Sequence, residues 1–230
     1  MTVNSYIPRD SKASRHAAEI LRRLRGEYPT AECELTWENP LQLLVAVILS
    51  AQCTDVRVNI VTQTLFKKYH TPQDYLNVPV EELETDIHST GFFRNKARSI
   101  RGACARIIEE YDGEVPQDMN EILTLPGVAR KTANVVLGVA FGQANGVVVD
   151  THIGRLSYRL GLTKETDPKK IERDLMKLLP QSEWIYAGHA IIWHGRRVCY
   201  ARKPNCGACV LEDICPKNGV ATARPAKKKG

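Results

Sequence analysis

The amino-acid sequence predicts an all-α protein, and three observations lead to this fold class. Apolar residues recur at the spacing of amphipathic helices along most of the chain. Helix start signals, in which an N-cap residue precedes a proline, occur repeatedly. The only strand-like run is Val147-Val-Val149, which is too short to found a sheet. We therefore expect about ten helices and no sheet.

The expected helices can be followed in order along the chain. A first helix over residues 11–25 has an apolar face that needs a packing partner, formed by Ala17, Ile20, Leu21 and Leu24. The N-cap and proline start recurs at Asn39-Pro40, Thr71-Pro72 and Asp167-Pro168. Between Asp55 and Tyr69 the apolar residues form the stripe of an amphipathic helix. The best internal boundary lies near residues 142–146, and the pattern leaves open which half the first helix packs on.

The composition indicates a soluble globular protein. Of its 230 residues, 43% are hydrophobic and 25% are charged. The most apolar stretch, residues 41–49, is too short to span a bilayer, and the first residues lack the order of a secretory signal. We therefore expect a cytoplasmic protein with no membrane association, whose cysteines stay reduced.

The net charge of +6 suggests a polyanionic partner, but this charge is unevenly distributed. Residues 217–230 hold five of the 32 basic residues and no acidic one, which leaves 27 basic against 26 acidic residues elsewhere. A nucleic-acid site must therefore come from local clustering. We expect residues 217–230 to form a disordered basic tail.

Four of the seven cysteines lie within one short segment. Cys33, Cys53 and Cys104 are scattered in apolar or helical surroundings, where a small buried side chain is the ordinary interpretation. The other four have the spacing C-x6-C-x2-C-x5-C and are Cys199, Cys206, Cys209 and Cys215. In a reducing compartment such a group indicates a metal site. Zinc and a [4Fe–4S] cluster both accept four thiolates, and the wide spacing modestly favours the larger cluster in a structural role.

The loop between the first two cysteines is basic. It carries Arg202 and Lys203, and Arg196 and Arg197 precede it. These side chains could contact DNA phosphates, or they could simply belong to a solvated loop. Charge alone does not separate the two interpretations.

A second motif is the segment Leu125-Pro-Gly-Val-Ala-Arg-Lys-Thr-Ala133, which lies between two helical patterns. Its Pro-Gly turn would present the backbone N–H groups of a helix N-terminus, which can bind a phosphate, although an ordinary helix corner has the same pattern. Lys131 falls in the first turn, where the helix end and Arg130 would disfavour its ammonium form. A neutral lysine amine is a nucleophile that forms Schiff bases. Asp150 is at the least a natural N-cap.

Together these segments resemble the endonuclease III family, the helix-hairpin-helix DNA glycosylases that carry an iron–sulfur cluster. The resemblance rests on the lysine-bearing hairpin, on Val149-Asp-Thr-His-Ile153 and on the cysteine spacing. Two further segments, Ile48-Leu-Ser-Ala-Gln-Cys-Thr-Asp55 and Thr90-Gly-Phe-Phe-Arg-Asn-Lys-Ala97, also match. In all, the resemblance covers residues 15 to 216.

The resemblance implies a fold of two helical domains that flank a DNA-binding cleft. A six-helix domain would comprise residues 33–144, with the helix-hairpin-helix motif at about residues 120–142. Residues 1–32 would join residues 145–216 in a domain that holds a [4Fe–4S] cluster. The implied activity is that of a bifunctional DNA glycosylase and abasic-site lyase, and a monomer is the default expectation. Its implied substrate is double-stranded DNA with an oxidised pyrimidine or an abasic site.

The resemblance also implies roles for individual residues. Lys131 would be the nucleophile and Asp150 the supporting carboxylate. Gln52 and Phe92 would fill the space left by the flipped base, while the hairpin would contact DNA through Gly127, Ala129, Arg130 and Thr132. Two positions depart from the family pattern: Phe92 replaces an aliphatic residue, and Ala129 replaces the second glycine of Gly-Val-Gly. We expect the alanine to restrict approach to the phosphate or to shift the turn.

Two other functions are compatible with part of the sequence: a monofunctional glycosylase and a DNA-binding module without catalytic activity. A monofunctional glycosylase on the same scaffold would keep the aspartate and the cluster but lack the lysine, so Lys131 argues against it. A metal-stabilised DNA-binding module would explain the cysteines and the basic loop. Such a module gives no reason for Lys131 and Asp150 to occur together in the register of the family.

Overall fold

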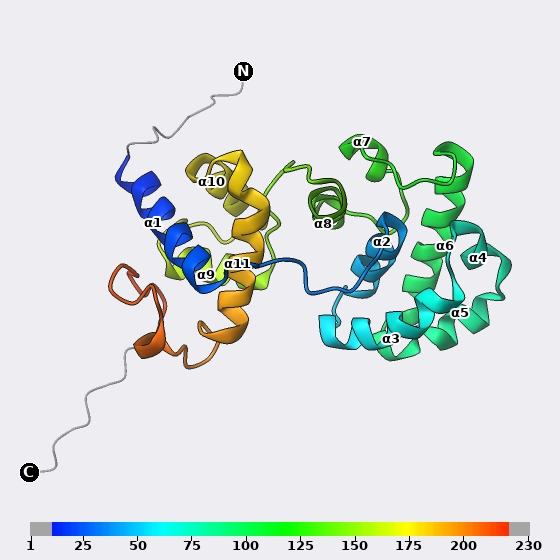
Figure 1. The fold of residues 1–230 in the computed structure, drawn as a ribbon, viewed down its shortest axis with the longest axis horizontal. Coiled ribbons are helices and arrows are strands. Elements are labelled where there is room, and N and C mark those ends of the chain that lie inside the picture. Colours follow the sequence, from blue (N-terminus) through cyan, green and yellow to red (C-terminus); the bar gives the residue numbers. More distant parts are fainter. Residues whose placement is uncertain (1–10, 221–230) are drawn as a thin grey trace, which may run out of the picture. The chain divides into compact units, whose positions relative to one another are not determined.

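The computed structural model describes residues 11–220, and the expected all-α fold class is confirmed (Figure 1). The described residues contain helices, turns and loops but no strand, and Val147-Val-Val149 is part of a loop. Contacts within the chain divide it into two compact units. One comprises residues 33–145, and the other joins the residues up to 32 with those from 146 onward.

The unit of residues 33–145 has seven α-helices in its fully described length, one more than the expected six, and α7 is only a single turn. They are α2 (Pro40–Leu49), α3 (Asp55–Lys68), α4 (Pro72–Asn77), α5 (Val80–Asp86), α6 (Phe93–Glu110), α7 (Met119–Ile122) and α8 (Arg130–Phe141), with the 3-10 turn η1 (His88–Thr90) before α6.

Helix α2 is the centre of this unit. All its residues after Pro40 are buried, and it contacts α3, α6 and α8, while α4 packs on α6. A helix that is apolar on every side is stable only when neighbours cover it completely. This burial explains why the most apolar run of the sequence is a core helix. None of the described helices is both long and apolar enough to cross a membrane.

The predicted N-cap and proline starts are confirmed at all three places. The side chains of Asn39 and Asp167 accept hydrogen bonds from backbone N–H groups three residues on. Thr71 and Asp74 form a reciprocal capping box at the start of α4. These side chains satisfy N–H groups that have no partner within the helix, which sets the helix boundaries locally.

The second unit contains α1 (Lys12–Glu27), α9 (Thr151–Arg159), α10 (Pro168–Leu178) and α11 (Trp184–Arg197), with the 3-10 turns η2 (Gln181–Glu183) and η3 (Cys206–Ala208). Helix α1 contacts α10 and α11, which answers the question that the sequence pattern left open. Its buried side chains include Ala17, Ile20, Leu21 and Leu24, the predicted apolar face.

The disordered tail was predicted to begin at residue 217, but the structure describes residues 217–220 and shows them bonded to the rest of the chain. Lys217 donates its backbone N–H to Cys215 Sγ, and Asn218 Nδ2 donates to Tyr158 O at 2.9 Å. These bonds fasten residues 217–220 to the end of α9 and to the last cysteine. A basic composition did not reveal them, because they are made by backbone and amide groups. The rest of the predicted tail, residues 221–230, lies outside the described residues.

Candidate active site and metal centre

The hairpin forms between α7 and α8, as predicted. Its turn is closed by the Val128 N–H, which donates to Leu125 O at 3.1 Å. Gly127 has φ +80, and a Cβ at this position would lie 2.4 Å from Ser99 Cβ on α6. Only glycine meets both conditions, because other residues are strained at positive φ and their Cβ would clash here. Gly127 therefore fixes the hairpin against α6.

Helix α8 begins directly after this turn, with Ala129 as its N-cap residue. Ala129 has φ −93, a backbone conformation that any residue can adopt, so the alanine is accommodated here without strain. It makes no side-chain hydrogen bond that would cap the first N–H groups. Arg130, Lys131 and Thr132 form the first turn, and the Lys131 side chain is exposed. The predicted position of the lysine, at the start of a helix beside the hairpin, is confirmed.

Asp150 is the N-cap of α9, in the other unit. Its Oδ1 accepts a hydrogen bond from the Ile153 N–H at 2.8 Å, which confirms the N-cap interpretation. This bond holds the carboxylate in a defined orientation at the positive end of the helix, where a negative charge is favoured. Lys131 and Asp150 are thus each placed at the N-terminus of a helix, one in each unit.

Gln52 and Phe92 occupy two loops of the hairpin unit, and both have left-handed backbones, with φ of 54° and 50°. Gln52 follows α2, and Phe92 is the N-cap residue of α6. The side chain of Phe92 is 61% exposed although it is large and apolar. An exposed aromatic residue on a strained backbone is unusual in a loop without a binding role.

Sequence reasoning missed Lys96, which lies close to both loops. Its side chain is only 5% exposed, and its Nζ donates to the carbonyls of Leu49 and Thr90 at 2.8 Å each. The available signal was its position on the buried stripe of α6, four residues before Ile100. A lysine within an apolar stripe needs partners for its charge.

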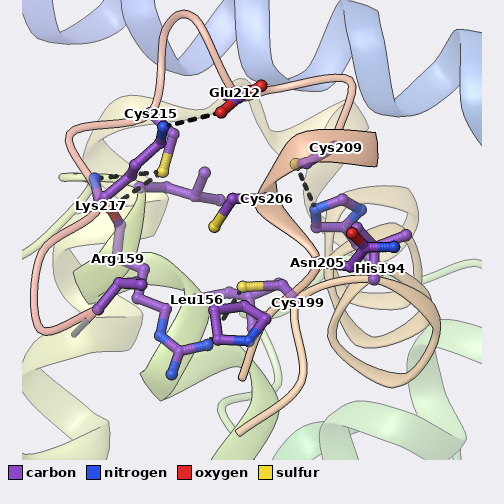
Figure 2. Close-up of a pocket in the computed structure, with 14 residues that line it drawn as sticks. Leu156, Arg159, His194, Cys199, Asn205, Cys206, Cys209, Glu212, Cys215 and Lys217 are labelled. Carbon is purple, nitrogen blue, oxygen red and sulfur yellow. Dashed lines mark hydrogen bonds and ion pairs between the residues drawn. The ribbon is translucent and has the colours of Figure 1, made fainter. Parts of the chain in front are cut away.

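The four clustered cysteines line one pocket, together with Arg159, His194, Lys217 and other residues (Figure 2). The described residues contain no group of three or more His, Cys, Asp or Glu side chains that could hold a single metal ion. The four thiols line the same pocket, as the ligands of one cluster would.

Hydrogen-bond donors face these sulfur atoms. Arg159 Nη1 lies 3.3 Å from Cys199 Sγ, and the Leu211 N–H lies 3.4 Å from Cys209 Sγ. Burial raises the pKa of the Cys209 and Cys215 thiols, so a positively charged group is needed to hold them as thiolates. Donors of this kind also stabilise the sulfurs of an iron–sulfur cluster. The residues present therefore fit such a cluster.

His194 of α11 adds a neutral partner beside Cys209 (Figure 2). Burial lowers the pKa of its imidazole to about 4, so the ring carries no charge at neutral pH. Its Nε2 lies 3.3 Å from Cys209 Sγ, while its Nδ1 lies 3.1 Å from the Tyr28 hydroxyl. The ring thus connects α1 to the cysteine segment without adding charge next to the sulfurs.

Arg159 fixes the backbone of the basic loop between Cys199 and Cys206. It donates to Tyr200 O at 2.7 Å and to Ala201 O at 2.9 Å. Arg202 and Lys203 are exposed at the tip of this loop. Arg197, by contrast, stacks on Trp193 with its Cζ 3.8 Å from the ring centre. All four basic residues around this loop are exposed, but Arg202 and Lys203 are the two that lie within the loop itself.

Comparison with known proteins agrees with this arrangement. The family model of HhH-GPD superfamily base excision DNA repair proteins matches residues 45–181, and that of the iron–sulfur binding domain of endonuclease III matches residues 199–215. Endonuclease III of Synechocystis sp. is 58% identical over 214 residues, which cover 93% of this chain and 98% of the relative. Endonuclease III of Escherichia coli K12 is 43% identical over 197 residues, covering 86% of this chain and 93% of the relative.

A solved structure is similar as well. The structure of a trapped endonuclease III–DNA covalent intermediate superimposes with a TM-score of 0.84 and 48% sequence identity, covering 89% of this chain and 96% of that one. The hairpin and the cysteine pocket in one helical chain define an iron–sulfur DNA repair enzyme. The chain belongs to the endonuclease III family, within the HhH-GPD superfamily. It is a DNA glycosylase and abasic-site lyase that carries a [4Fe–4S] cluster, so the predicted family, activity and cofactor are confirmed.

Proposed function

We propose that this enzyme excises oxidised pyrimidines from double-stranded DNA with Lys131 as the nucleophile and Asp150 as the supporting carboxylate. The observation that carries the assignment is the exposed position of Lys131 in the first turn of α8, directly after the hairpin turn. A phosphate bound by the uncapped N–H groups of that turn would bring the neighbouring sugar within reach of the amine.

The chemistry follows from these groups. A base within a duplex is out of reach, so the damaged nucleotide is flipped out of the stack. Positive charge grows on the sugar as the bond from C1′ to the base breaks, and the Asp150 carboxylate stabilises this charge. The neutral Lys131 amine forms a bond to C1′, and the base leaves with the electron pair of the broken bond.

The strand is then cut by elimination. The sugar ring opens to give a Schiff base between C1′ and Lys131. This imine acidifies the C2′ proton, and removal of that proton expels the 3′ phosphate, which breaks the strand on the 3′ side. Hydrolysis of the imine returns the free lysine. The same steps apply to an abasic site that already exists, without excision of a base.

The remaining predicted residues bind the DNA. Gln52 has amide groups that can pair with the base opposite the gap, and Phe92 can insert into the stack as other apolar wedges do. The hairpin, from Gly127 to Thr132, provides backbone N–H groups to a phosphate, and Arg202 and Lys203 contact phosphates without reading sequence. All these residues come from one chain, so we propose a monomer that acts in the cytoplasm, where the bacterial chromosome lies.

The four cysteines, Cys199, Cys206, Cys209 and Cys215, would be the ligands of the cluster. Four protein thiolates leave no open coordination position, so the cluster would provide structural cross-linking of the segment rather than a step of the reaction. Its effect on DNA binding is then indirect, through the basic loop that begins at Cys199.

Borohydride trapping tests the central assignment. Borohydride reduces the Schiff base, so wild-type protein should become covalently attached to duplex DNA with an abasic site. Lys131→Ala should abolish this product while DNA binding persists. Lys131→Arg should fail as well, because a guanidinium keeps its proton and is a poor nucleophile. Strand cleavage on the same duplex would separate the proposed activity from both a monofunctional glycosylase and a DNA-binding module.

Lys169 offers a matched control. It is exposed and occupies the second position of α10, as Lys131 does in α8. Lys169→Ala should therefore trap as efficiently as the wild type. Robust trapping by Lys131→Ala, mapped to another lysine or to the N-terminal amine, would overturn the assignment.

A further inference from the structure

Lys96 is a buried lysine that forms hydrogen bonds next to two loops, the one that carries Gln52 and the one that carries Phe92. It lies in the first turn of α6 with 5% of its surface exposed. Burial lowers the pKa of its ammonium group. The two hydrogen bonds from its Nζ go to backbone carbonyls, at Leu49 and Thr90, each at 2.8 Å. These carbonyls belong to segments about forty residues apart in the sequence.

Each carbonyl lies at the base of one loop. Leu49 is the last residue of α2, three residues before Gln52. Thr90 ends η1, two residues before Phe92. In addition, the backbone N–H of Lys96 donates to Phe92 O at 3.1 Å. Lys96 therefore bonds to the loop of Phe92 at Thr90 and at Phe92 itself, and its ammonium joins that loop to the end of α2, where the loop of Gln52 begins.

The two loops need such a restraint. Gln52 and Phe92 have positive φ, a conformation that costs free energy for residues other than glycine. Phe92 is largely exposed, so packing of its own side chain does not hold it in place. The loop of Gln52 has two described backbone turn bonds, from the Ala51 N–H to Ile48 O at 3.4 Å and from the Cys53 N–H to Ser50 O at 3.1 Å, and neither involves Gln52 itself. Bonds to the adjacent backbone are thus the main source of order for both loops.

Stability alone does not account for a lysine at this position. Taking an ammonium group out of water is costly, and an apolar residue of similar volume often stabilises a core as well or better. What the lysine adds is a fixed geometry. An ammonium group that donates to the carbonyls of Leu49 and Thr90 sets the distance between these two carbonyls. We infer that Lys96 is a positioning residue that fixes the loops of Gln52 and Phe92 relative to each other, so that both side chains enter the duplex together. This inference rests on the roles proposed for those two side chains.

The inference predicts a selective defect. Joint insertion matters most when a paired base must be flipped, and it matters less at an abasic site, where no base is left to unpair. Lys96→Met keeps the length of the side chain but cannot donate. It should slow excision of an oxidised pyrimidine by about tenfold or more, the scale of a lost charged hydrogen bond. Cleavage of a pre-formed abasic site should change less than about threefold, because unpairing contributes little there.

Two further variants keep the test specific. Lys96→Arg retains a charged donor and should restore part of the excision rate, whereas a purely space-filling role would favour methionine over arginine. Lys67→Met makes the same substitution at an exposed lysine of α3 and should leave both rates unchanged. Equal losses on both substrates, or no loss on either, would overturn the inference. Thermal unfolding of each variant shows whether it is folded.

A spectroscopic measurement tests Lys96 independently of the chemistry. A duplex with the stable abasic analogue tetrahydrofuran opposite 2-aminopurine reports insertion, because the fluorescence of 2-aminopurine changes when its neighbours unstack. With protein in excess, Lys96→Met should give a clearly smaller change than the wild type or Lys67→Met. An unchanged amplitude would contradict the positioning role. If the wild type inserts but excises nothing, the proposed function fails while this measurement still decides the role of Lys96.

Discussion

The two units provide helix N-termini that are built in opposite ways. In α9 the Asp150 carboxylate caps a backbone N–H and places a negative charge at the positive helix end. In α8 the N-cap is Ala129, which makes no such bond, and Arg130 and Lys131 add positive charge at the same kind of end. The first turn of α9 is capped by its own N-cap side chain, whereas the first turn of α8 has no such cap and would, on the function proposed above, bind a DNA phosphate.

This difference shows how the same local element serves two purposes. The α8 end lacks a capping side chain, which for a good N-cap is worth about 1 kcal/mol relative to alanine. In the proposed function its backbone N–H groups would bind a phosphate instead. Packing elsewhere supports it, because Gly127 seats the hairpin on α6 and Val136 and Leu137 of α8 are fully buried. The α9 end keeps its capping bond, and in the proposed function the same carboxylate would stabilise charge in the reaction.

The largest expected effect comes from removing the charge at the α9 end without removing the cap. Asn caps a helix as well as Asp does, so the free energy of unfolding of Asp150→Asn should lie within about 0.5 kcal/mol of the wild-type value. Base excision should nevertheless slow by about a hundredfold or more, because the charge that stabilises the transition state is lost. Single-turnover excision and thermal unfolding measure the two quantities.

Asp167 provides the matched control for this substitution. It caps α10 through the same kind of bond, to the Lys170 N–H at 3.1 Å. Asp167→Asn should therefore leave excision unchanged. Borohydride trapping of Asp150→Asn on a pre-formed abasic site should fall less than excision does, since Lys131 is still present. Loss of trapping in full proportion to excision would contradict the proposed division of roles.

Local signals made most of the helix starts predictable from the sequence. Asn39, Thr71 and Asp167 act on N–H groups within three residues, so their effect does not depend on the rest of the fold. The same holds for Asp150 as an N-cap and for the position of Lys131 in the first turn of α8. The spacing of the four cysteines was sufficient to indicate a metal site, because all of them lie in one short segment.

What could not be predicted depends on contacts between distant segments. Lys96 bonds to Leu49, and Arg159 bonds to the loop after Cys199, across many residues of sequence. The apolar stripe of α6 shows that Lys96 is buried and needs partners, but the local pattern of either side chain does not show which distant groups it bonds to. The attachment of Asn218 to Tyr158 was missed for the same reason. A bond of this kind is determined by how the elements pack, which local periodicity does not describe.

A smaller effect is expected from the basic loop of the cluster unit, which would contact phosphate through side chains rather than backbone. Lys203→Ala should weaken binding to damaged and undamaged duplexes equally, by about tenfold or less at physiological salt. The slope of log affinity against log salt should decrease by about one unit, because one phosphate contact is lost. Lys164→Ala, at another exposed lysine of this unit, should change neither quantity. A loss confined to damaged DNA would instead make the loop part of lesion recognition.

The smallest expected effect sharpens the comparison at the α8 end itself. Ala129→Gly restores the residue that is usual in the family and removes the methyl group next to the donor N–H groups. Glycine is also a better N-cap than alanine, and φ −93 is open to both residues, so the turn should keep its shape. The affinity for DNA should increase by about threefold. Because a tenfold change corresponds to about 1.4 kcal/mol, this is a gain of about half that binding free energy. The salt slope should stay the same, because no charge is added or removed. Fluorescence anisotropy over a range of salt concentrations separates the two quantities. A changed slope would mean that the hairpin acts through its charged side chains, and weaker binding would mean that the alanine methyl is itself part of the contact.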